Sequence, residues 1–499
     1  MFTSILIANR GEIAVRIIRA ARELGIRTIA VYSEADRLAP HVLAADEAYL
    51  IGPAPSAESY LRGDRIVDVA LRAGADAIHP GYGFLAERAP FIRQVRDAGL
   101  VFVGPSAEAV EAMGDKTAAR RRMIAAGVPV VPGTSDPLAD AAEARQAAEE
   151  IGYPVLLKAA AGGGGKGMRI VQSSAEIESA FGSAGREAKS AFGDDAVYVE
   201  KYLAGPRHLE IQILADRAGT TVHLGERECS IQRRHQKLVE EAPSAVLTAD
   251  ERFAMGATAV AAGRAVQYEG AGTVEFLYQH GAFYFLEMNT RIQVEHPVTE
   301  LVTGIDLVQW QIRIAAGEAL NFAQTDVSFR GHAIECRITS EDPANSFLPS
   351  AGRIEWLEIP SGAGVRWDGG IARGYEIGLH YDPMLAKVIV HAPSRELAID
   401  RMRRALTELR VVGVETSAPF HLRVMEEADF RAGKLDILYL DRHGDELTDF
   451  EPSDEELRVV ALATVLLEEE RRARRSITRI DHGDALGSGW SGRGGWTGR

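Results

Sequence analysis

Polar and charged side chains occupy every second position between residues 287 and 295, namely Glu287, Asn289, Arg291, Gln293 and Glu295. Alternate side chains of a β-strand point to the same face of the sheet. If this stretch stays extended, its five functional groups line one wall. The competing interpretation is an exposed strand with a solvated polar face.

A second carboxylate stands opposite this run. Segments 273–278 and 282–288 are predicted to form a β-hairpin with a turn at 279–281, and Glu275 and Glu287 each lie six residues from the last residue of that turn. Directly opposed carboxylates repel each other in a sheet. Oxygen ligands of this kind bind magnesium, usually together with substrate phosphates. The pairing therefore favours a divalent-cation site over a solvated face.

A glycine tract follows a predicted apolar strand. The strand covers residues 152–158 and ends in Lys158, and residues 162–167 read Gly-Gly-Gly-Gly-Lys-Gly. Glycine lets backbone N–H groups approach phosphate oxygens. The tract is not a Walker loop, because no Lys-Ser or Lys-Thr pair ends it. A flexible linker is the alternative, but the strand that leads into the tract favours phosphate binding.

Lysine is scarce, since only eight of the 56 basic residues are lysines. A lysine in this chain is therefore less expected to serve as a general surface cation. One lysine lies in the charged segment 226–241, for which a solvated loop is the competing interpretation. Point charges placed on anionic substrate groups explain why five of the eight stand near motif-like segments. These five are Lys116, Lys158, Lys166, Lys201 and Lys237.

Composition limits the classes of protein to consider. The chain has 499 residues, a hydrophobic fraction of 46% and a formal net charge of −15. These values fit several globular domains and exclude the basic face of a nucleic-acid-binding protein. Cys229 and Cys336 stand far apart, so no disulfide framework or paired-cysteine zinc site is expected. The short N-terminal apolar run is too short for a signal peptide, and no stretch approaches the roughly 20 apolar residues of a membrane span. We expect a soluble, cytoplasmic, multidomain protein with no nucleic-acid or membrane partner.

The first third of the chain alternates short apolar runs with helical patterns, which predicts a parallel, doubly wound sheet. Its predicted strands are 4–8, 28–32, 76–79 and 100–103, and the first helix is 12–24. The turn between the first strand and this helix contains one glycine, Gly11. It therefore lacks the three-glycine fingerprint of a dinucleotide site, and such a site is disfavoured. Further strands are predicted at 197–202, 208–214, 333–338 and 387–391, and further helices at 396–409 and 454–475. Ser453 and Glu456 form a capping-box pattern before the last helix.

Several of these segments resemble known signatures. Residues 153–167 (YPVLLKAAAGGGGKG) and 285–292 (FLEMNTRI) are similar to those of ATP-grasp enzymes of the carbamoyl-phosphate synthase type. Segments IANRGEI, HPGYGFL, QRRHQK, RIQVEHPVTE and YDPMLAK narrow the resemblance to biotin carboxylase, the ATP-dependent component of biotin-dependent carboxylases. The resemblance runs from about residue 2 to residue 440.

The resemblance implies an α/β and α+β architecture. An N-terminal doubly wound parallel sheet is followed by a central ATP-grasp fold with a mobile glycine-rich lid and by a C-terminal mixed α/β domain. The expected divisions are an N-terminal domain (1–113), the ATP-grasp domain (114–330, with the lid at about 131–203), a C-terminal domain (331–445), and an extra helix with a flexible tail (446–499).

The resemblance also assigns roles to residues. Glu295 would remove the proton of bicarbonate, with Lys237, Arg291, Gln293 and Val294 around that anion. Arg337 would stabilise the biotin enolate, with Tyr82 near the biotin ring. Magnesium or manganese, as two ions, would be bound by Glu275, Glu287 and Asn289. The implied ATP-binding residues are Lys116, Lys158, Gly163, Gly164, Gly165, Lys166, Gly167, Met168, Glu200, Lys201, Tyr202, Leu203, His208, Gln232, His235, Leu277, Glu287 and Ile437.

The resemblance further implies partners. No lysine is flanked by two methionines, so biotin would be supplied by a separate carrier protein and the reaction finished by a carboxyltransferase subunit. Arg19, Glu23 and Arg366 match positions used in the homodimer interface of bacterial relatives, although Ala363 replaces a common aromatic residue. The final acceptor is expected to be acetyl-CoA or propionyl-CoA.

Alternatives remain at this stage. One is the biotin carboxylase subunit of a two-subunit pyruvate carboxylase. Another is an ATP-grasp ligase for a different carboxylate, and a third is a catalytically silent nucleotide-binding subunit. The helix at 454–475 and the Trp-containing tail could dock a partner subunit, but we favour a surface helix followed by a flexible end.

Overall fold

The computed structural model describes residues 1–134, 136–159, 168–192, 196–450 and 454–476. Met1–Thr448 form one compact unit, and Asp449–Arg499 form a second unit. The predicted glycine tract at 162–167 lies outside the described residues, and so do Ser453 and the tail after residue 476.

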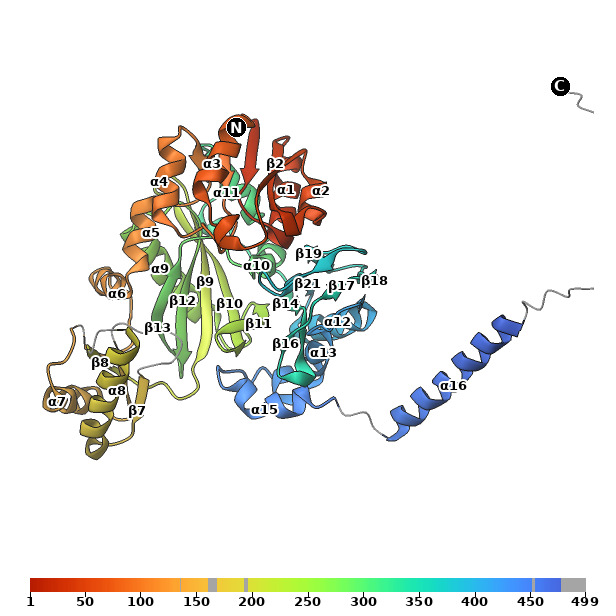
Figure 1. Cartoon of the computed structure of the whole chain (residues 1–499). Coiled ribbons are helices and arrows are strands. Elements are labelled where there is room, and N and C mark those ends of the chain that lie inside the picture. The colour runs from red at the N-terminus through yellow and green to blue at the C-terminus, as the bar shows by residue number, and fades with distance from the viewer. Residues whose placement is uncertain (135, 160–167, 193–195, 451–453, 477–499) are drawn as a thin grey trace, which may run out of the picture. The chain divides into compact units, whose positions relative to one another are not determined.

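The N-terminal sheet is parallel and has the strand order β3-β2-β1-β4-β5. Ile5 and Ile7 of β1 pack into one core with helix α1, whereas Leu6 points into a second core with α3 and α4 (Figure 1). Helices therefore cover both faces, and the predicted doubly wound sheet is confirmed. The strands are β1 (Ser4–Ile7), β2 (Arg27–Ser33), β3 (Glu47–Gly52), β4 (Ala77–His79) and β5 (Val101–Phe102), and the helices are α1 (Gly11–Glu23), α2 (Pro40–Ala44), α3 (Gly63–Arg72), α4 (Ala89–Asp97) and α5 (Ala107–Gly114).

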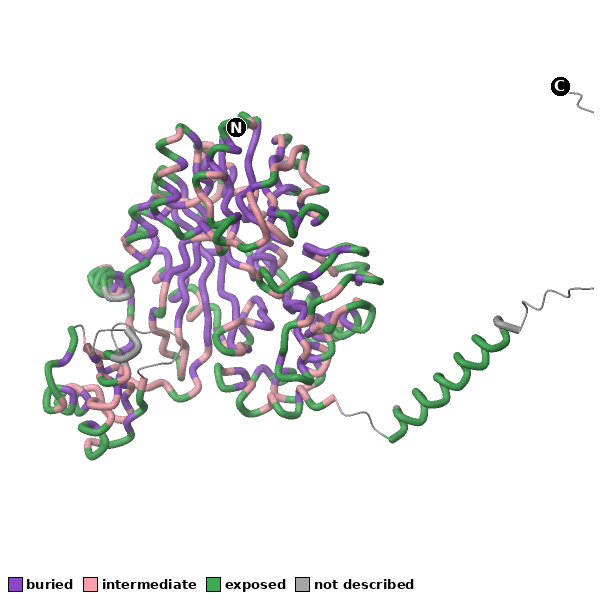
Figure 2. The backbone as a smooth tube through the Cα atoms, viewed as in Figure 1, coloured by how far each residue is buried: buried purple, intermediate pink, exposed green. Residues whose placement is uncertain are grey.

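A larger, antiparallel sheet has the order β13-β12-β9-β10-β11-β14-β21-β19. The pairing of β11 with β14 carries this sheet across the predicted boundary at residue 330. Figure 2 shows its strands as a largely buried layer. They are β9 (Arg207–Ala215), β10 (Thr221–Arg233), β11 (Gln236–Ala242), β12 (Gly270–Gln279), β13 (Ala282–Asn289), β14 (His332–Thr339), β19 (Val365–Gly369) and β21 (Met384–Ala392), with helices α9 (Ala249–Ala265), α10 (His296–Thr303), α11 (Leu307–Ala315) and α12 (Arg395–Glu408).

The β12–β13 hairpin brings Glu275 opposite Glu287, as predicted, but by a different route. The turn has two residues, His280 and Gly281, with positive φ angles of 51° and 80°, which suits the tight turns of hairpins. A bulge at Leu286 then shifts the register by one residue. The prediction of a three-residue turn at 279–281 was therefore wrong. The turn at 280–281 alone would place Glu275 opposite Leu286, and the bulge moves that partner to Glu287.

The expected lid region forms a sheet of its own, with the order β7-β6-β8. Helices α7 and α8 pack on it, and its buried core draws only on residues 138–199 (Figure 1). Its elements are β6 (Val155–Ala159), β7 (Met168–Val171), β8 (Val197–Lys201), α7 (Ala141–Ile151) and α8 (Ile177–Phe192).

The rest of the described chain consists of short elements and one long helix. Helix α16 (Asp454–Ser476) confirms the predicted helix, and the described side chains along it are exposed (Figure 2). The described helices include none long and apolar enough to cross a membrane. The remaining elements are α6 (Lys116–Ala125), β15 (Glu341–Asp342), β16 (Leu348–Pro349), β17 (Gly352–Arg353), β18 (Trp356–Glu358), β20 (Glu376–Ile377), β22 (Arg410–Val412), α13 (Ala418–Glu426), α14 (Ala428–Arg431) and α15 (Tyr439–Thr448).

Candidate active site

The largely buried ammonium group of Lys237 gathers three carboxylates, two from the large sheet and one from the N-cap of α10. Lys237 Nζ of β11 lies 2.5 Å from Glu210 Oε2, 3.0 Å from Glu275 Oε1 and 2.6 Å from Glu295 Oε1. Glu210 and Glu275 are cross-strand partners on β9 and β12. Three carboxylates therefore surround the Lys237 ammonium, away from bulk solvent.

Glu275 is held by neutral donors as well. Asn289 Nδ2 donates to Glu275 Oε1 at 2.9 Å, and Gln293 Nε2 donates to the same oxygen at 2.8 Å. Burial by itself raises the pKa of Glu275, but Lys237 and His208 outweigh it and lower that pKa far below its usual range. The Glu275 carboxylate is therefore ionised at any working pH.

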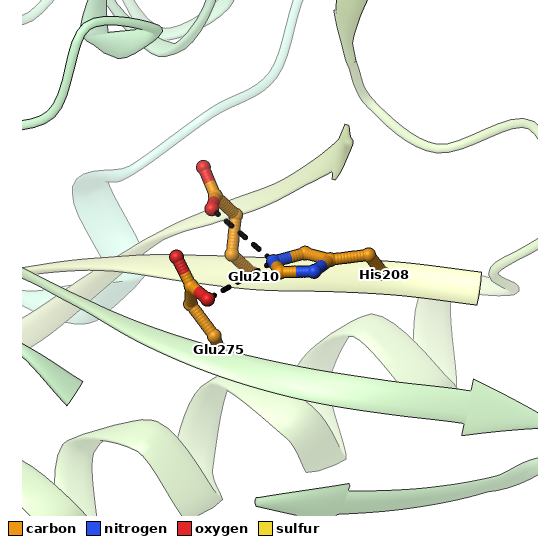
Figure 3. A group of neighbouring side chains, drawn as sticks. All are labelled: His208, Glu210 and Glu275. Carbon is orange, nitrogen blue, oxygen red and sulfur yellow. Dashed lines mark ion pairs between the residues drawn. The ribbon is translucent and has the colours of Figure 1, made fainter. Parts of the chain in front are cut away.

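A group of side chains that could hold a metal ion lies on the same wall. Ligand atoms of His208, Glu210 and Glu275 lie within 4.8 Å of one another, and all three residues are buried. Figure 3 shows the two carboxylates converging on one edge of the imidazole ring, with His208 Nε2 3.2 Å from Glu275 Oε2. Of these three residues, Glu275 alone belongs to the predicted metal set, and His208 and Glu210 are further candidate ligands.

The run from Glu287 to Glu295 does not stay extended. Strand β13 ends at Asn289, and α10 begins at His296. The side chains gather nevertheless, because the intervening loop bends back over the sheet. Arg291 Nη2 donates to Asn289 Oδ1 at 2.9 Å, and Arg291 Nε donates to Glu87 Oε2 at 2.8 Å. The predicted extended run was therefore wrong. Asn289 and Gln293 nevertheless reach Glu275, Glu295 reaches Lys237 and Arg291 contacts Asn289, whereas Glu287 is placed by its pairing with Glu275.

Arg337 of β14 bridges two buried carboxylates. Its Nη2 lies 2.8 Å from Glu295 Oε2 and 2.5 Å from Glu240 Oε1. Burial raises the pKa of Glu295, but Lys237 and Arg337 outweigh this effect and hold the pKa well below its usual range. Burial also raises the pKa of Glu240, to about 7. The two carboxylates beside Arg337 thus differ in proton affinity, and that of Glu295 is the lower.

Tyr82 lies at the edge of this cluster. Its hydroxyl donates to the Glu12 carboxylate of α1. Burial raises the pKa of Tyr82 far above its usual range, and the nearby Arg337 charge counteracts this only in part. The two residues expected near biotin, Tyr82 and Arg337, therefore belong to one electrostatic neighbourhood.

The predicted nucleotide residues are only partly brought together. Lys158 Nζ contacts Glu200 Oε2 at 2.9 Å across β6 and β8. Lys201 Nζ donates to the Gly152 carbonyl at 2.7 Å, so its ammonium is engaged by backbone in this structure. Gln232 Nε2 is likewise engaged by the Cys229 carbonyl, at 2.7 Å.

Other predicted nucleotide residues lie near the start of β9. Leu277 pairs with His208 across the sheet, and the Ile437 N–H donates to the Pro206 carbonyl at 3.0 Å. Two further predicted nucleotide residues lie on other elements. His235 lies in the turn between β10 and β11 with a positive φ of 67°, and Met168 begins β7 opposite Lys158. The side chain of Lys116 and all of Gly163, Gly164, Gly165, Lys166 and Gly167 lie outside the described residues.

Family models match the chain in three consecutive parts. The N-terminal domain of biotin carboxylase covers residues 1–110, the ATP-binding domain of the carbamoyl-phosphate synthase L chain covers 115–323, and the C-terminal domain of biotin carboxylase covers 335–442. The biotin carboxylase of Haemophilus influenzae is 52% identical over 443 residues, which is 89% of this chain and 99% of the relative. The chain belongs to the biotin carboxylase family.

Further relatives agree with this membership. A pyruvate carboxylase subunit of Methanothermobacter thermautotrophicus is 55% identical over 444 residues, 89% of this chain and 90% of the relative. A solved structure shows the biotin carboxylase domain dimer of Hydrogenobacter thermophilus 2-oxoglutarate carboxylase in complex with MgADP, ADP and bicarbonate. Its sequence is 51% identical to this chain, and the two structures superpose with a TM-score of 0.82. The match covers 91% of this chain and the whole of the Hydrogenobacter chain. The predicted family and fold class are confirmed, and the chain is an ATP-dependent ligase of the biotin carboxylase family.

Sequence reasoning missed several buried polar residues of this biotin carboxylase. Glu210 could have been found, because it lies two residues after His208 on a strand and so shares its face. Arg227 carries no motif signal, yet it is fully buried and its guanidinium reaches Glu210 Oε1 at 2.5 Å and Gln293 Oε1 at 2.8 Å. Glu240 and Lys387 likewise show their roles only when β11, β14 and β21 are paired.

Proposed function

We propose that this chain carboxylates biotin on a separate carrier protein, using ATP and bicarbonate, with carboxyphosphate as the intermediate. The observation that carries the proposal is Glu295, a buried carboxylate held between Lys237 Nζ at 2.6 Å and Arg337 Nη2 at 2.8 Å. A base flanked by two cations suits an anionic substrate that must lose a proton.

The first step joins bicarbonate to the terminal phosphoryl group. A bicarbonate oxygen attacks the γ-phosphorus of ATP, the bond from that phosphorus to the β–γ bridging oxygen breaks, and ADP leaves. Glu295 takes the proton of bicarbonate, while Lys237 and Arg291 orient the anion. Such transfers depend on positioning and charge neutralisation, and a positioned carboxylate contributes general-base catalysis.

The basicity of Glu295 must change when substrate binds. In the free site its pKa is held well below the usual range, since Lys237 and Arg337 outweigh the effect of burial. A carboxylate stabilised so strongly as the anion is a weak base. Bicarbonate would share the hydrogen bonds of the same two cations, which withdraws stabilisation from the Glu295 anion and raises its proton affinity.

The acidic wall fits magnesium or manganese, in two ions. Glu275, Glu287 and Asn289 offer the oxygen donors that hard cations prefer, and the hairpin register places Glu275 opposite Glu287. Glu275 is also ionised, as a ligand must be. A bound cation would neutralise phosphate charge, while the ATP-binding residues named from the sequence would hold the nucleotide.

The second step carboxylates biotin. Carboxyphosphate separates into CO2 and phosphate, the phosphate takes the N1 proton of biotin, and N1 attacks the carbon of CO2. Arg337 would stabilise the negative charge on the ureido oxygen, because its guanidinium stays charged and donates several hydrogen bonds. Tyr82 would lie beside the biotin ring.

We propose that the carboxylated carrier then serves a carboxyltransferase subunit whose acceptor is acetyl-CoA or propionyl-CoA. A second candidate, a 2-oxo acid, is supported by the relatives that are named as subunits of pyruvate carboxylase and of 2-oxoglutarate carboxylase. Co-purification of the carboxyltransferase from the source cells, followed by assays with each acceptor, distinguishes the two. The dimer named for the Hydrogenobacter domain supports a homodimer here, which a solution mass measurement tests.

Steady-state ADP release tests the proposed reaction. ADP release should require bicarbonate and should rise when free biotin is added. Glu295→Gln should reduce the bicarbonate-dependent rate by about 100-fold to 10,000-fold, whereas the exposed Glu355→Gln should not change it. Release that is independent of bicarbonate would overturn the proposal, and dependence on another carboxylate would indicate a different ATP-grasp ligase.

A further inference from the structure

A fully buried lysine connects the two ends of the candidate site. Lys387 of β21 has no exposed surface. Its Nζ donates to the Val294 carbonyl at 2.7 Å and lies 3.2 Å from Glu12 Oε1. The same Glu12 oxygen accepts the hydroxyl of Tyr82. One ammonium thus joins the segment expected to bind bicarbonate to the residue expected beside biotin.

The contact with Val294 fixes a particular peptide group. Val294 precedes Glu295, the N-cap of α10, so its carbonyl lies outside the helix and needs a partner from elsewhere. That carbonyl belongs to the planar peptide unit that contains the Glu295 N–H. Holding its oxygen therefore orients the backbone from which the Glu295 side chain projects.

Burying the Lys387–Glu12 pair costs folding free energy, which argues against a purely structural purpose. Burying a lysine and a glutamate requires desolvating both charges, and apolar pairs of similar volume usually stabilise a fold as well or better. Charged groups act on Lys387 from three neighbouring elements: Glu335 on β14, Asp368 and Arg366 on β19, and Glu12 on α1. His296 of α10 also lies near Lys387, and burial together with that charge holds the pKa of its imidazole well below the usual range. Despite this choice of acids, Nζ is directed to Glu12 and Val294.

A glycine permits the approach of Glu12 to β21. Gly370 follows β19 directly, and a Cβ atom there would lie 2.7 Å from the Glu12 backbone nitrogen and 2.8 Å from Gly11 Cα. No side chain at position 370 fits against the backbone of Gly11 and Glu12. The start of α1 therefore packs against the backbone beside β21, at the distance that lets the Glu12 carboxylate reach Lys387.

We propose that Glu12 and Lys387 are positioning residues that couple the biotin side of the site, at Tyr82, to the bicarbonate side, at Val294 and Glu295. The inference rests on the proposed function. It predicts that breaking the pair disturbs bicarbonate use and the transfer to biotin more than it disturbs nucleotide binding.

Three variants test the coupling: Lys387→Met, Glu12→Gln and the double variant. In Lys387→Met the KM for bicarbonate should rise at least about tenfold, the loss of roughly one good hydrogen bond. The amount of carboxybiotin formed per ADP released should fall in Lys387→Met and in Glu12→Gln. The Kd for ADP, measured by calorimetry, should stay within about twofold. Lys434→Met, at an exposed lysine paired with Asp429, is the matched control and should behave as wild type.

The double variant separates positioning from folding. Lys387→Met alone leaves a buried carboxylate without its counter-charge, which destabilises the fold. Adding Glu12→Gln removes that charge and should restore the free energy of unfolding without restoring the KM for bicarbonate. Recovery of both quantities together, or an unchanged KM in Lys387→Met, would overturn the inference. A wild-type enzyme whose ADP release ignores bicarbonate would overturn the proposed function itself.

Discussion

Glu335 on β14 stands directly opposite Glu240 on β11, and both carboxylates are fully buried. Neither oxygen of Glu335 has a hydrogen-bond partner among the described residues. Two facing acids in a buried site disfavour two negative charges. Burial raises the pKa of Glu335 well above its usual range, and the positive charges of Lys387 and Arg337 offset this only in part.

Replacing Glu335 should therefore change how stability depends on pH. Because its folded-state pKa is raised, Glu335 holds a proton that the unfolded chain releases above about pH 4.3. The unfolded state then gains stability as pH rises, by at most about 1.4 kcal/mol per pH unit. Glu335→Gln has no such proton, so its stability advantage over wild type should grow from pH 5 to pH 8. Urea unfolding across this range measures the effect.

The exposed Glu355→Gln is the control for that experiment. Its unfolding curve should follow that of wild type at every pH. If Glu335→Gln also parallels wild type between pH 5 and pH 8, the buried acid is ionised in the folded state and our interpretation of the Glu240–Glu335 pair is wrong.

Arg227 should be among the most costly side chains to remove. It is fully buried and donates to Glu210, Gln212, Thr273, Gln293 and Thr299. Arg227→Met would leave the buried Glu210 with one counter-charge fewer, and breaking a buried pair in this way costs about 3–5 kcal/mol. Chemical denaturation measures the loss in the free energy of unfolding.

Arg217 provides the comparison, because its guanidinium also pairs with a glutamate, Glu269, at 3.1 Å, but its side chain is about half exposed. Arg217→Met should change stability by no more than about 0.5 kcal/mol. Equal losses in the two variants would contradict the importance assigned to the buried arginine.

Magnesium dependence tests the opposed acids of the hairpin. If Glu287 is a ligand, Glu287→Gln should raise the free Mg²⁺ concentration needed for half-maximal ADP release by at least about tenfold, since a neutral amide binds a hard cation less well than a carboxylate. The titration is made at fixed ATP, and Mn²⁺ should shift in the same direction. Glu318→Gln, at a partly exposed acid that pairs with Arg313, should leave the titration unchanged, and an unchanged curve in Glu287→Gln would remove that residue from the metal site.

Rules based on local sequence predicted the two opposed acids of the hairpin but missed the buried polar residues around them. Opposed positions such as Glu275 and Glu287 follow from strand alternation and turn placement, although the prediction reached them through the wrong turn and without the bulge at Leu286. Scarcity of lysine pointed to Lys237 but also to Lys201, whose ammonium binds the Gly152 carbonyl. Lys387 ends the YDPMLAK segment, but its contacts with Glu12 and Val294 arise from the packing of distant segments.

The same contrast explains the loop after Asn289. Alternation predicted an extended run to Glu295, yet His296–Thr303 form a helix with Pro297 in its first turn, a position that proline favours. The helix start bends the chain, and tertiary contacts rather than strand geometry bring Gln293 and Glu295 to the site.

Truncation after Thr448 should leave the enzyme folded and active. Met1–Thr448 are one compact unit, and the described side chains of α16, including Leu457, Leu462 and Leu466, are exposed. A cut after Thr448 therefore falls at the division between the two units and leaves the first unit whole. The midpoint of thermal unfolding should shift by less than about 2 °C, and bicarbonate-dependent ADP release with free biotin should keep its rate.

The same truncation distinguishes a surface helix from a docking element. If α16 only extends from the unit, the shortened chain should still capture its carboxyltransferase partner in a pull-down with the full-length chain as reference. Seven large aliphatic side chains of this helix are exposed, namely Leu457, Val459, Val460, Leu462, Val465, Leu466 and Leu467. Loss of capture with unchanged ADP release would show that residues 449–499 bind the partner, against the interpretation favoured from the sequence.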